Sequence, residues 1–178
     1  MEEDITTTNL TTTAGATVSA CGTYRYHLWR SWDENRPHLT FLMLNPSTAD
    51  ALSDDPTLRR ISKISREFGY GGVDVLNLYA FRSPHPSILA KAKSPHGPHQ
   101  THYLSQQIIK LQNTQTPLVL AWGNHAKTAD TQDILHRLTQ AEITLTTLGL
   151  TKQHQPMHPL FSPTPPKLYP YQPPSSQI

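Results

Sequence analysis

Cysteine is almost absent from this sequence, because Cys21 is the single cysteine among 178 residues. An intrachain disulfide is therefore impossible, and a zinc site built from cysteine thiolates is not expected. Such scarcity is typical of proteins that work in a reducing compartment, so we expect a cytoplasmic protein.

Long apolar runs are also missing. No stretch approaches the roughly 20 apolar residues that are needed to span a bilayer. The acidic start Met1-Glu2-Glu3-Asp4 lacks the basic and apolar regions of a signal peptide. The sequence therefore predicts a protein with no membrane partner.

The chain lacks an excess of charge of one sign, with 15 Lys+Arg against 13 Asp+Glu. This near balance gives no strong overall attraction to nucleic acid or to an anionic membrane surface. A local basic stripe remains compatible with it. We expect a monomer.

The length suits one domain with one hydrophobic core. Residues 1–16 are rich in threonine and have little apolar surface to bury, so we interpret them as a flexible tail. Residues 163–178 are rich in proline and serine, which predicts an extended strap that Tyr169 and Tyr171 hold to the body. The single α/β domain then spans residues 17–162.

Between these ends, segments with strand periodicity alternate with segments of helical periodicity. The clearest helix begins at Asp55-Pro56, where Asp caps free amides and Pro fits the first helical position. This alternation predicts a three-layer α/β/α fold with a central, mostly parallel sheet. We expect strands at 23–30, 39–44, 73–78, 118–122 and 143–148, and helices at 56–68, 87–92, 101–112 and 128–139.

Polar or turn-forming residues follow each apolar strand. Asn45 follows the strand at 39–44, Asn77 ends the next one, and His158 comes after the last. In parallel α/β sheets, ligands bind outside the carboxyl ends of the strands, so we expect these side chains to line one cleft.

The same segments resemble domain-of-unknown-function family 1643, over about residues 19–171. That family name implies no established activity. The resemblance rests on Tyr24-Arg25-Tyr26, Leu44-Asn45-Pro46-Ser47-Thr48-Ala49-Asp50, Asp54-Asp55-Pro56-Thr57, Asn77-Leu78, Trp122-Gly123, Leu148-Gly149-Leu150-Thr151-Lys152 and His158-Pro159-Leu160.

More distantly, the motif order is similar to that of the uracil-DNA glycosylase superfamily. This resemblance implies a uracil-DNA-glycosylase-like fold and a hydrolase that cleaves the N-glycosidic bond of a base in DNA. It implies that Asn45 orients the hydrolytic water and that Asn77 reads the base edge. It also implies that His158 stabilises the departing base, with Leu160 or Phe161 as the wedge into the base stack.

The residue types suit that chemistry, because negative charge grows on the leaving base and a fixed donor such as an imidazole stabilises it. Asn45 does not ionise near neutral pH and could only position water. No aromatic residue follows Pro46 before Phe68, and the last motif reads His158-Pro159-Leu160 rather than His-Pro-Ser. These departures favour a modified base over uracil, with Tyr79, Phe81 or Trp122 as a substitute stacking ring.

The other candidate contacts fall into two groups. Arg59 and Lys63, on the polar face of the first helix, are candidate phosphate contacts or a solvated helix face. The candidate substrate contacts are Pro46, Ser47, Asn77, Trp122, Gly123, Asn124, Thr151, Lys152, Leu160 and Phe161.

Alternatives remain open for most of these residues. Asn45-Pro46 could simply form a turn, and Asn77 could be a structural amide. His96, His99 and His102 have no cysteine or carboxylate close by in the sequence, so we predict no metal site and no cofactor. Besides a DNA glycosylase, the sequence allows a non-catalytic module that binds a nucleotide or nucleic acid, or an enzyme that acts on free nucleotides.

Overall fold

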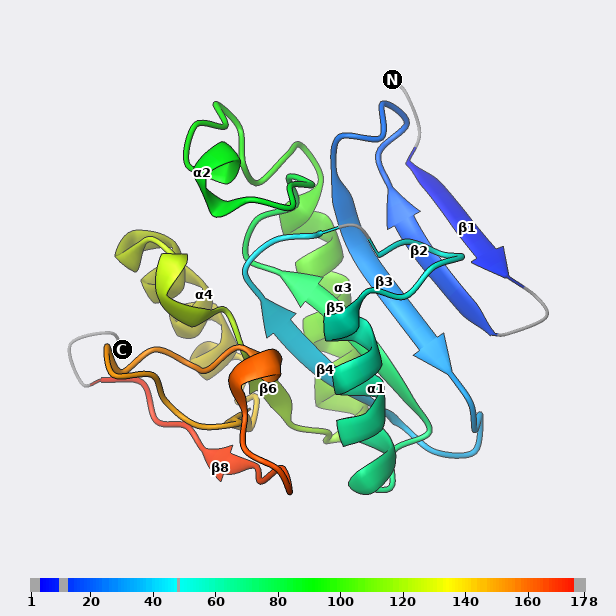
Figure 1. Cartoon of the computed structure of the whole chain (residues 1–178), viewed down its shortest axis with the longest axis vertical. Coiled ribbons are helices and arrows are strands. Elements are labelled where there is room, and N and C mark those ends of the chain that lie inside the picture. Colours follow the sequence, from blue (N-terminus) through cyan, green and yellow to red (C-terminus); the bar gives the residue numbers. More distant parts are fainter. Residues whose placement is uncertain (1–3, 10–12, 48, 175–178) are drawn as a thin grey trace.

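A computed structural model describes residues 4–9, 13–47 and 49–174 of the chain (Figure 1). The described strands form one eight-stranded sheet in the order β1-β2-β3-β5-β4-β6-β7-β8. In chain order, the elements are β1 (Ile5–Asn9), β2 (Ala14–Val18), β3 (Arg25–Ser31), β4 (His38–Met43), α1 (Pro56–Glu67), β5 (Gly72–Asn77), α2 (Pro86–Leu89), α3 (Gln100–Thr114), β6 (Leu118–Leu120), η1 (Gly123–His125), α4 (Thr128–Gln140), β7 (Leu145–Thr147), η2 (Pro159–Phe161) and β8 (Tyr169–Pro170).

The sheet is mixed, so the prediction of a mostly parallel sheet is wrong. The central strands β5, β4, β6 and β7 are parallel, but four of the seven pairings among the described strands are antiparallel. A short connection such as that from β2 to β3 permits only antiparallel pairing, whereas parallel neighbours need a long crossover. The segments that contain α1, α3 and α4 supply such crossovers.

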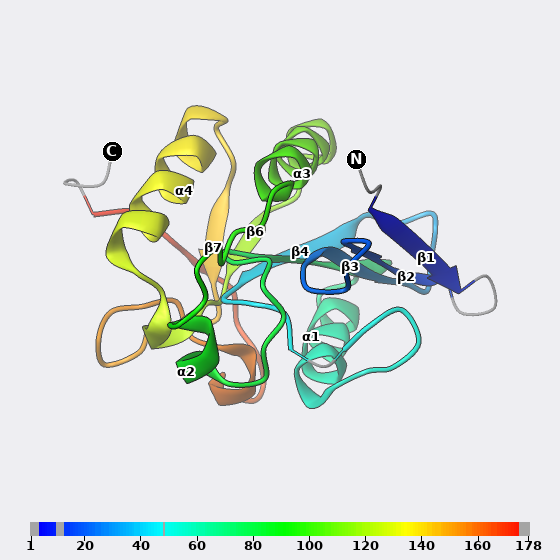
Figure 2. The ribbon, with the colours of Figure 1, turned by 90° about the horizontal axis from the view of Figure 1, so that it is seen from above.

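Helices cover both faces of the sheet. Figure 2 shows α3 and α4 on one side and α1 on the other, and Leu89 of the short α2 packs with the hydrophobic cluster on the α3 and α4 side. Leu39 and Phe41 of β4 face the α1 side with Ile61 of α1, whereas Leu42 faces the α3 and α4 side with Leu104. The loop after β4 therefore leads to one face and the loop after the neighbouring β6 leads to the other. Such a reversal opens a crevice at the carboxyl ends of the strands.

α1 begins as the sequence predicts. The side chain of Asp55 accepts a hydrogen bond from the Leu58 amide at 2.8 Å, and Pro56 occupies the first helical turn. Leu58, Ile61 and Ile64 are buried against the sheet. The helix thus presents its amino end, and with it Asp55, to the crevice.

The amino-terminal segment differs from the predicted flexible tail. Residues 5–9 form β1 and residues 14–18 form β2, which pairs with both β1 and β3. Threonine favours extended backbone, and Thr6 and Thr17 bring their hydroxyl oxygens within 3.2 Å across the strand pair. Gly15 lies directly under the Trp29 ring, where a Cβ would overlap it. Residues 1–3 and 10–12 of the predicted tail lie outside the described residues.

The carboxyl-terminal segment lies along the body. β8 pairs antiparallel with β7, and the Tyr171 amide donates to the Leu145 carbonyl at 2.9 Å. Tyr171 packs against the buried apolar residues on the α3 and α4 side of the sheet, and Leu168 packs against those on the α1 side. No helix among the described residues has the length and apolar character that crossing a bilayer requires.

Candidate functional site

A small pocket lies on the α1 side of the sheet, at the carboxyl ends of the parallel strands. Its volume is about 60 Å³, and Asn45, Ser47, Asn77 and His158 are among its lining residues. The structure therefore brings the three predicted strand-end residues Asn45, Asn77 and His158 together. The volume is well below the several hundred Å³ of typical small-molecule pockets, and it suits a few water molecules or one small chemical group.

The side chain of Asn45 has a fixed orientation. Its Nδ2 donates to the carbonyl oxygens of Ser83 at 2.8 Å and of Pro46 at 3.0 Å. Because a carbonyl oxygen can only accept, these contacts assign the amide nitrogen and leave Oδ1 as the free acceptor. Oδ1 has no hydrogen-bond partner among the described residues, so it is available to bind water.

The ring of His158 is also oriented. The Leu160 amide donates to Nδ1 at 3.3 Å, so the neutral imidazole carries its proton on Nε2. Burial lowers the pKa of His158 below its ordinary value, and the charge of Asp55 acts in the opposite direction. His158 is therefore a neutral donor through Nε2 at pH 7.

Asn77 is tied to the core through its backbone and its side chain. Its carbonyl oxygen accepts from Nε2 of Gln100, and its Oδ1 lies 3.5 Å from a guanidinium nitrogen of Arg25. This leaves Nδ2 of Asn77 as the polar atom with no partner in the described part of the chain. Asn77 therefore adds a donor to the pocket.

Two charged residues that the sequence analysis did not assign to the site, Arg25 and Asp55, also line the pocket. Arg25 begins β3, whose alternating pattern indicates only a strand. Asp55 was predicted as the cap of α1, which it is. Its place just before a helix that starts beside the crevice is the one sequence signal that could have added it to the site. Arg25 gives no comparable signal.

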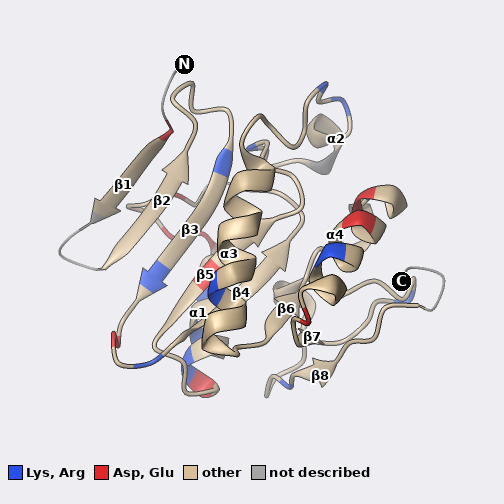
Figure 3. Cartoon of the chain, turned by 180° about the vertical axis from the view of Figure 1, so that it is seen from behind, with Lys and Arg blue, Asp and Glu red and all other residues tan. Residues whose placement is uncertain are grey.

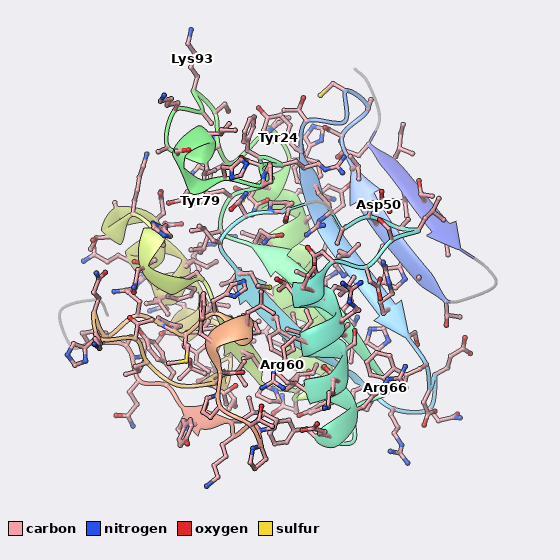
Figure 4. The ribbon with its side chains drawn as sticks, in the orientation of Figure 1. Tyr24, Asp50, Arg60, Arg66, Tyr79 and Lys93 are labelled. Carbon is pink, nitrogen blue, oxygen red and sulfur yellow. The ribbon has the colours of Figure 1, made fainter. Side chains whose placement is uncertain are left out.

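Several other predicted contacts lie next to the pocket rather than in it. Leu160 and Phe161 on η2 are 48% and 77% exposed, and the Phe161 ring centroid is 5.9 Å from that of His158. η2 is held to α1 by Arg60, which donates to the carbonyl of Pro163 at 2.9 Å and to the Ser162 hydroxyl at 3.1 Å. Figure 4 shows Arg60 on α1 beside the segment that carries η2.

The loop after β6 packs next to His158. Gly123 packs near His158, where a Cβ would lie 3.9 Å from that of His158, and its amide donates to the Pro156 carbonyl. Trp122 is buried and donates through Nε1 to the side chain of Gln155 at 3.1 Å.

The remaining predicted contacts lie in loops or, for Asn124, in η1. The Thr151 hydroxyl donates to Oδ1 of Asn124 at 2.6 Å, and Lys152 is exposed in the same turn. Pro46 is buried, and its carbonyl oxygen accepts from the Ser83 amide. None of these four residues is part of the described pocket lining.

The predicted phosphate contacts have partners on their own helix segment. Arg59 donates to the Asp54 carbonyl at 2.6 Å, and Lys63 lies 4.0 Å from the Glu67 carboxylate. On the opposite side of the molecule, Figure 3 shows charges of both signs on β3, β5, α3 and α4. Neither observation indicates a continuous basic track.

No phenylalanine, tyrosine or tryptophan is part of the described pocket lining. Tyr79 is buried and hydrogen-bonds to Asp130 at 2.7 Å, and Phe81 packs edge-on against Tyr24. With Trp122 also outside the pocket, none of the three proposed substitute rings stands where a base in the pocket would stack.

The histidines at 96, 99 and 102 point to different partners. His99 pairs with Asp4 at 2.6 Å, and His96 lies 3.3 Å from Asp130. His102 packs edge-on against Tyr103. Among the described residues, no group of three or more His, Cys, Asp or Glu side chains is arranged to hold a metal ion.

The fold and the pocket define an α/β protein with a small cavity, lined by both polar and apolar side chains, at the carboxyl ends of its parallel strands. The chain belongs to the family described as Protein of unknown function (DUF1643), which it matches over residues 25–160. Every pocket residue discussed above lies within that span. No curated protein and no solved structure matches the chain.

Proposed function

We propose that the protein is a hydrolase that cleaves an N-glycosidic bond, with Asn45 positioning the attacking water and His158 stabilising the departing base. The observation that supports it is that the Asn45 acceptor and the His158 donor line one pocket. An acceptor that holds water and a donor for developing negative charge are the two groups that this reaction needs.

The orientation of both groups agrees with these roles. The Asn45 amide is held by backbone carbonyls, so Oδ1 is preorganised and needs no rearrangement to bind water. His158 is neutral at pH 7 and donates through Nε2. Preorganised dipoles of this kind lower the barrier because they require no reorganisation during the reaction.

DNA that carries a modified base is the first substrate that we propose. Leu160 and Phe161 are exposed apolar side chains next to His158, as a wedge into a base stack would be. Extrusion of a base from the stack costs a few kcal/mol, and an apolar wedge offsets part of that cost.

A free nucleotide is the second candidate, and the contacts of Arg59 and Lys63 on α1 favour it over duplex DNA. Duplex binding relies on phosphate contacts from Lys and Arg, whereas Arg59 and Lys63 already contact Asp54 and Glu67. The cavity of about 60 Å³ also accommodates only part of a nucleotide, so the base itself would rest at the mouth of the pocket. A non-catalytic module would use the same pocket without turnover.

The test is an assay of base release from single-stranded and duplex DNA that contains uracil, hypoxanthine or bulkier modified pyrimidines, and from the corresponding free nucleotides. We expect release from at least one modified substrate, and loss of release in His158→Gln. The control is His154→Gln, since His154 is exposed in a turn away from the pocket. Binding without base release from any substrate would support the module and refute the hydrolase.

A further inference from the structure

Arg25 is a buried cation in the wall of the pocket. The residue is 4% exposed and lines the pocket together with Asn77 and His158. No carboxylate among the described residues lies within 4.0 Å of its guanidinium. Its two hydrogen bonds go to neutral oxygens, the Ala49 carbonyl and Oδ1 of Asn77.

A guanidinium has five N–H donors, and in the described part of the chain Arg25 uses two of them. Its Nε is buried without a partner among the described residues. Burying a charge costs several kcal/mol unless an opposite charge or a full set of hydrogen bonds compensates. Burial lowers the pKa of Arg25 to about 10, with the charge of Arg82 adding to the effect, so the side chain stays protonated at neutral pH. The cation is therefore only partly compensated.

The carboxylates of the neighbourhood are engaged elsewhere. Asp50 accepts from the amides of Leu52 and Ser53 in its own turn, and Asp55 caps α1. Asp54 pairs with Arg30 at 2.7 Å. Each acidic group thus has a local structural partner, and the charges of Asp55 and Asp50 offset the burial of Arg25 only in part, without a direct ion pair among the described residues.

The other free donors of the pocket have the same preference for negative charge. His158 offers Nε2–H and Asn77 offers Nδ2–H, and both line the cavity with Arg25. Arg25 and these two neutral donors attract oxygen atoms that bear negative charge, against the opposing charge of the Asp55 carboxylate, which lines the same cavity.

We propose that this pocket binds a small oxyanion through Arg25, namely a phosphate or carboxylate group of the protein's ligand. The volume of about 60 Å³ matches one such group rather than a whole nucleotide. The planar guanidinium forms two parallel hydrogen bonds to such a group, which a lysine ammonium does not. That the group belongs to a substrate rests on the proposed function, whereas anion binding itself does not.

The first experiment measures thermal unfolding with increasing inorganic phosphate, against chloride at equal ionic strength. We expect phosphate to raise the melting temperature, by about 5 to 10 °C when its concentration is about 100-fold above the dissociation constant. Chloride should have little effect. Calorimetric titration of the wild-type protein with phosphate provides the direct check, and absence of binding in it would overturn the inference without any variant.

Variants assign the binding to Arg25. Arg25→Met should abolish the phosphate-dependent shift, and Arg25→Lys, which keeps the charge, should reduce it and provide a second readout if the methionine variant does not fold. Arg36→Met is the matched control, because Arg36 is an exposed arginine in the 33–37 turn and its loss should leave the shift unchanged. An equal shift in Arg25→Met and the wild type would overturn the assignment.

Further titrations identify the source of the group and separate the two proposals. Acetate compares carboxylate with phosphate, and a nucleoside monophosphate compared with its nucleoside shows whether a nucleotide supplies the group. Phosphate binding without base release from any substrate refutes only the hydrolase. Base release without anion binding refutes only the Arg25 site.

Discussion

Nδ2 of Asn45 lies 2.8 Å from the carbonyl oxygen of Ser83, and this contact joins the loop after β4 to the loop after β5. The Ser83 amide returns a hydrogen bond to the Pro46 carbonyl at 2.9 Å. Two loops that lie far apart in the sequence therefore hold each other. Their pairing fixes the amide whose other atom, Oδ1, has no hydrogen-bond partner among the residues that the structure describes.

Asn45→Ala tests both roles of this amide. Loss of its hydrogen bonds should lower the free energy of unfolding by about 1 to 2 kcal/mol, since each net hydrogen bond contributes on the order of 1 kcal/mol. Turnover per folded molecule should fall by about 100-fold or more, because the water loses its position. Urea unfolding and the base-release assay measure the two effects. Asn113→Ala, at an exposed position of α3, should change neither.

Two substitutions of Asp55 distinguish its role as the cap of α1 from the role of its negative charge in the pocket. Asp55→Ala should lower the free energy of unfolding by about 1 kcal/mol, because the Leu58 amide loses its acceptor, whereas Asp55→Asn should stay within about 0.5 kcal/mol. We expect Asp55→Asn to lower turnover on the order of 100-fold, since the carboxylate lines the pocket where positive charge develops on the sugar. Full turnover in a stable Asp55→Asn variant would limit Asp55 to its structural role.

Sequence signals correctly predicted the elements that depend on interactions between residues close together in the chain. The cap at Asp55-Pro56 and the apolar stripe of Leu58, Ile61 and Ile64 place α1 where it is observed. Sheet partners depend on contacts between distant segments, which periodicity does not report. The antiparallel pairing of β3 with β5 and the strand β1 in a threonine-rich segment were therefore missed.

The same distinction holds for the candidate site. Asn45, Asn77 and His158 were found because the end of a strand is a local feature and parallel strands end at one edge. Arg25 was missed because it follows the alternating pattern of an ordinary strand. Its burial comes from the loop that contains Ala49, whose carbonyl it contacts, and that contact joins residues 24 positions apart.

The pKa of His158 gives a prediction for stability against pH. Burial lowers that pKa below 6.5, so between the two values the unfolded chain binds more protons than the folded one. The contribution of His158 to the free energy of unfolding is fully present above pH 6.5, and it is lost as the pH falls from 6.5 through the lowered pKa. The free energy of unfolding of the wild type should therefore decrease on acidification. Denaturant unfolding curves recorded between pH 5 and 8 measure this decrease. His158→Gln should show a weaker decrease, and His154→Gln should follow the wild type.

Asp74 provides a contrasting prediction, because it is buried on the other face of the sheet from the pocket. The residue is 1% exposed and accepts hydrogen bonds from His27 at 2.7 Å, His38 at 3.1 Å and Lys110 at 2.6 Å. Burial alone would raise the pKa of Asp74, but the hydrogen bonds from the two histidines and the charge of Lys110 lower it well below 3.8. The carboxylate is therefore a structural centre that joins β3, β4, β5 and α3.

Asp74→Asn keeps the shape of the side chain and removes its charge. It should lower the free energy of unfolding at pH 7 by about 2 to 3 kcal/mol, less than for a fully buried pair because Lys110 is partly exposed. The contribution is present above the ordinary pKa of an aspartate and is lost as the pH falls through it toward the lowered value, so the variant should lose less stability than the wild type on acidification below pH 4. Asp133→Asn, at an exposed position of α4, is the control. Base release per folded molecule should be unchanged in both variants. A selective loss of turnover in Asp74→Asn would show that the chemistry involves this face as well.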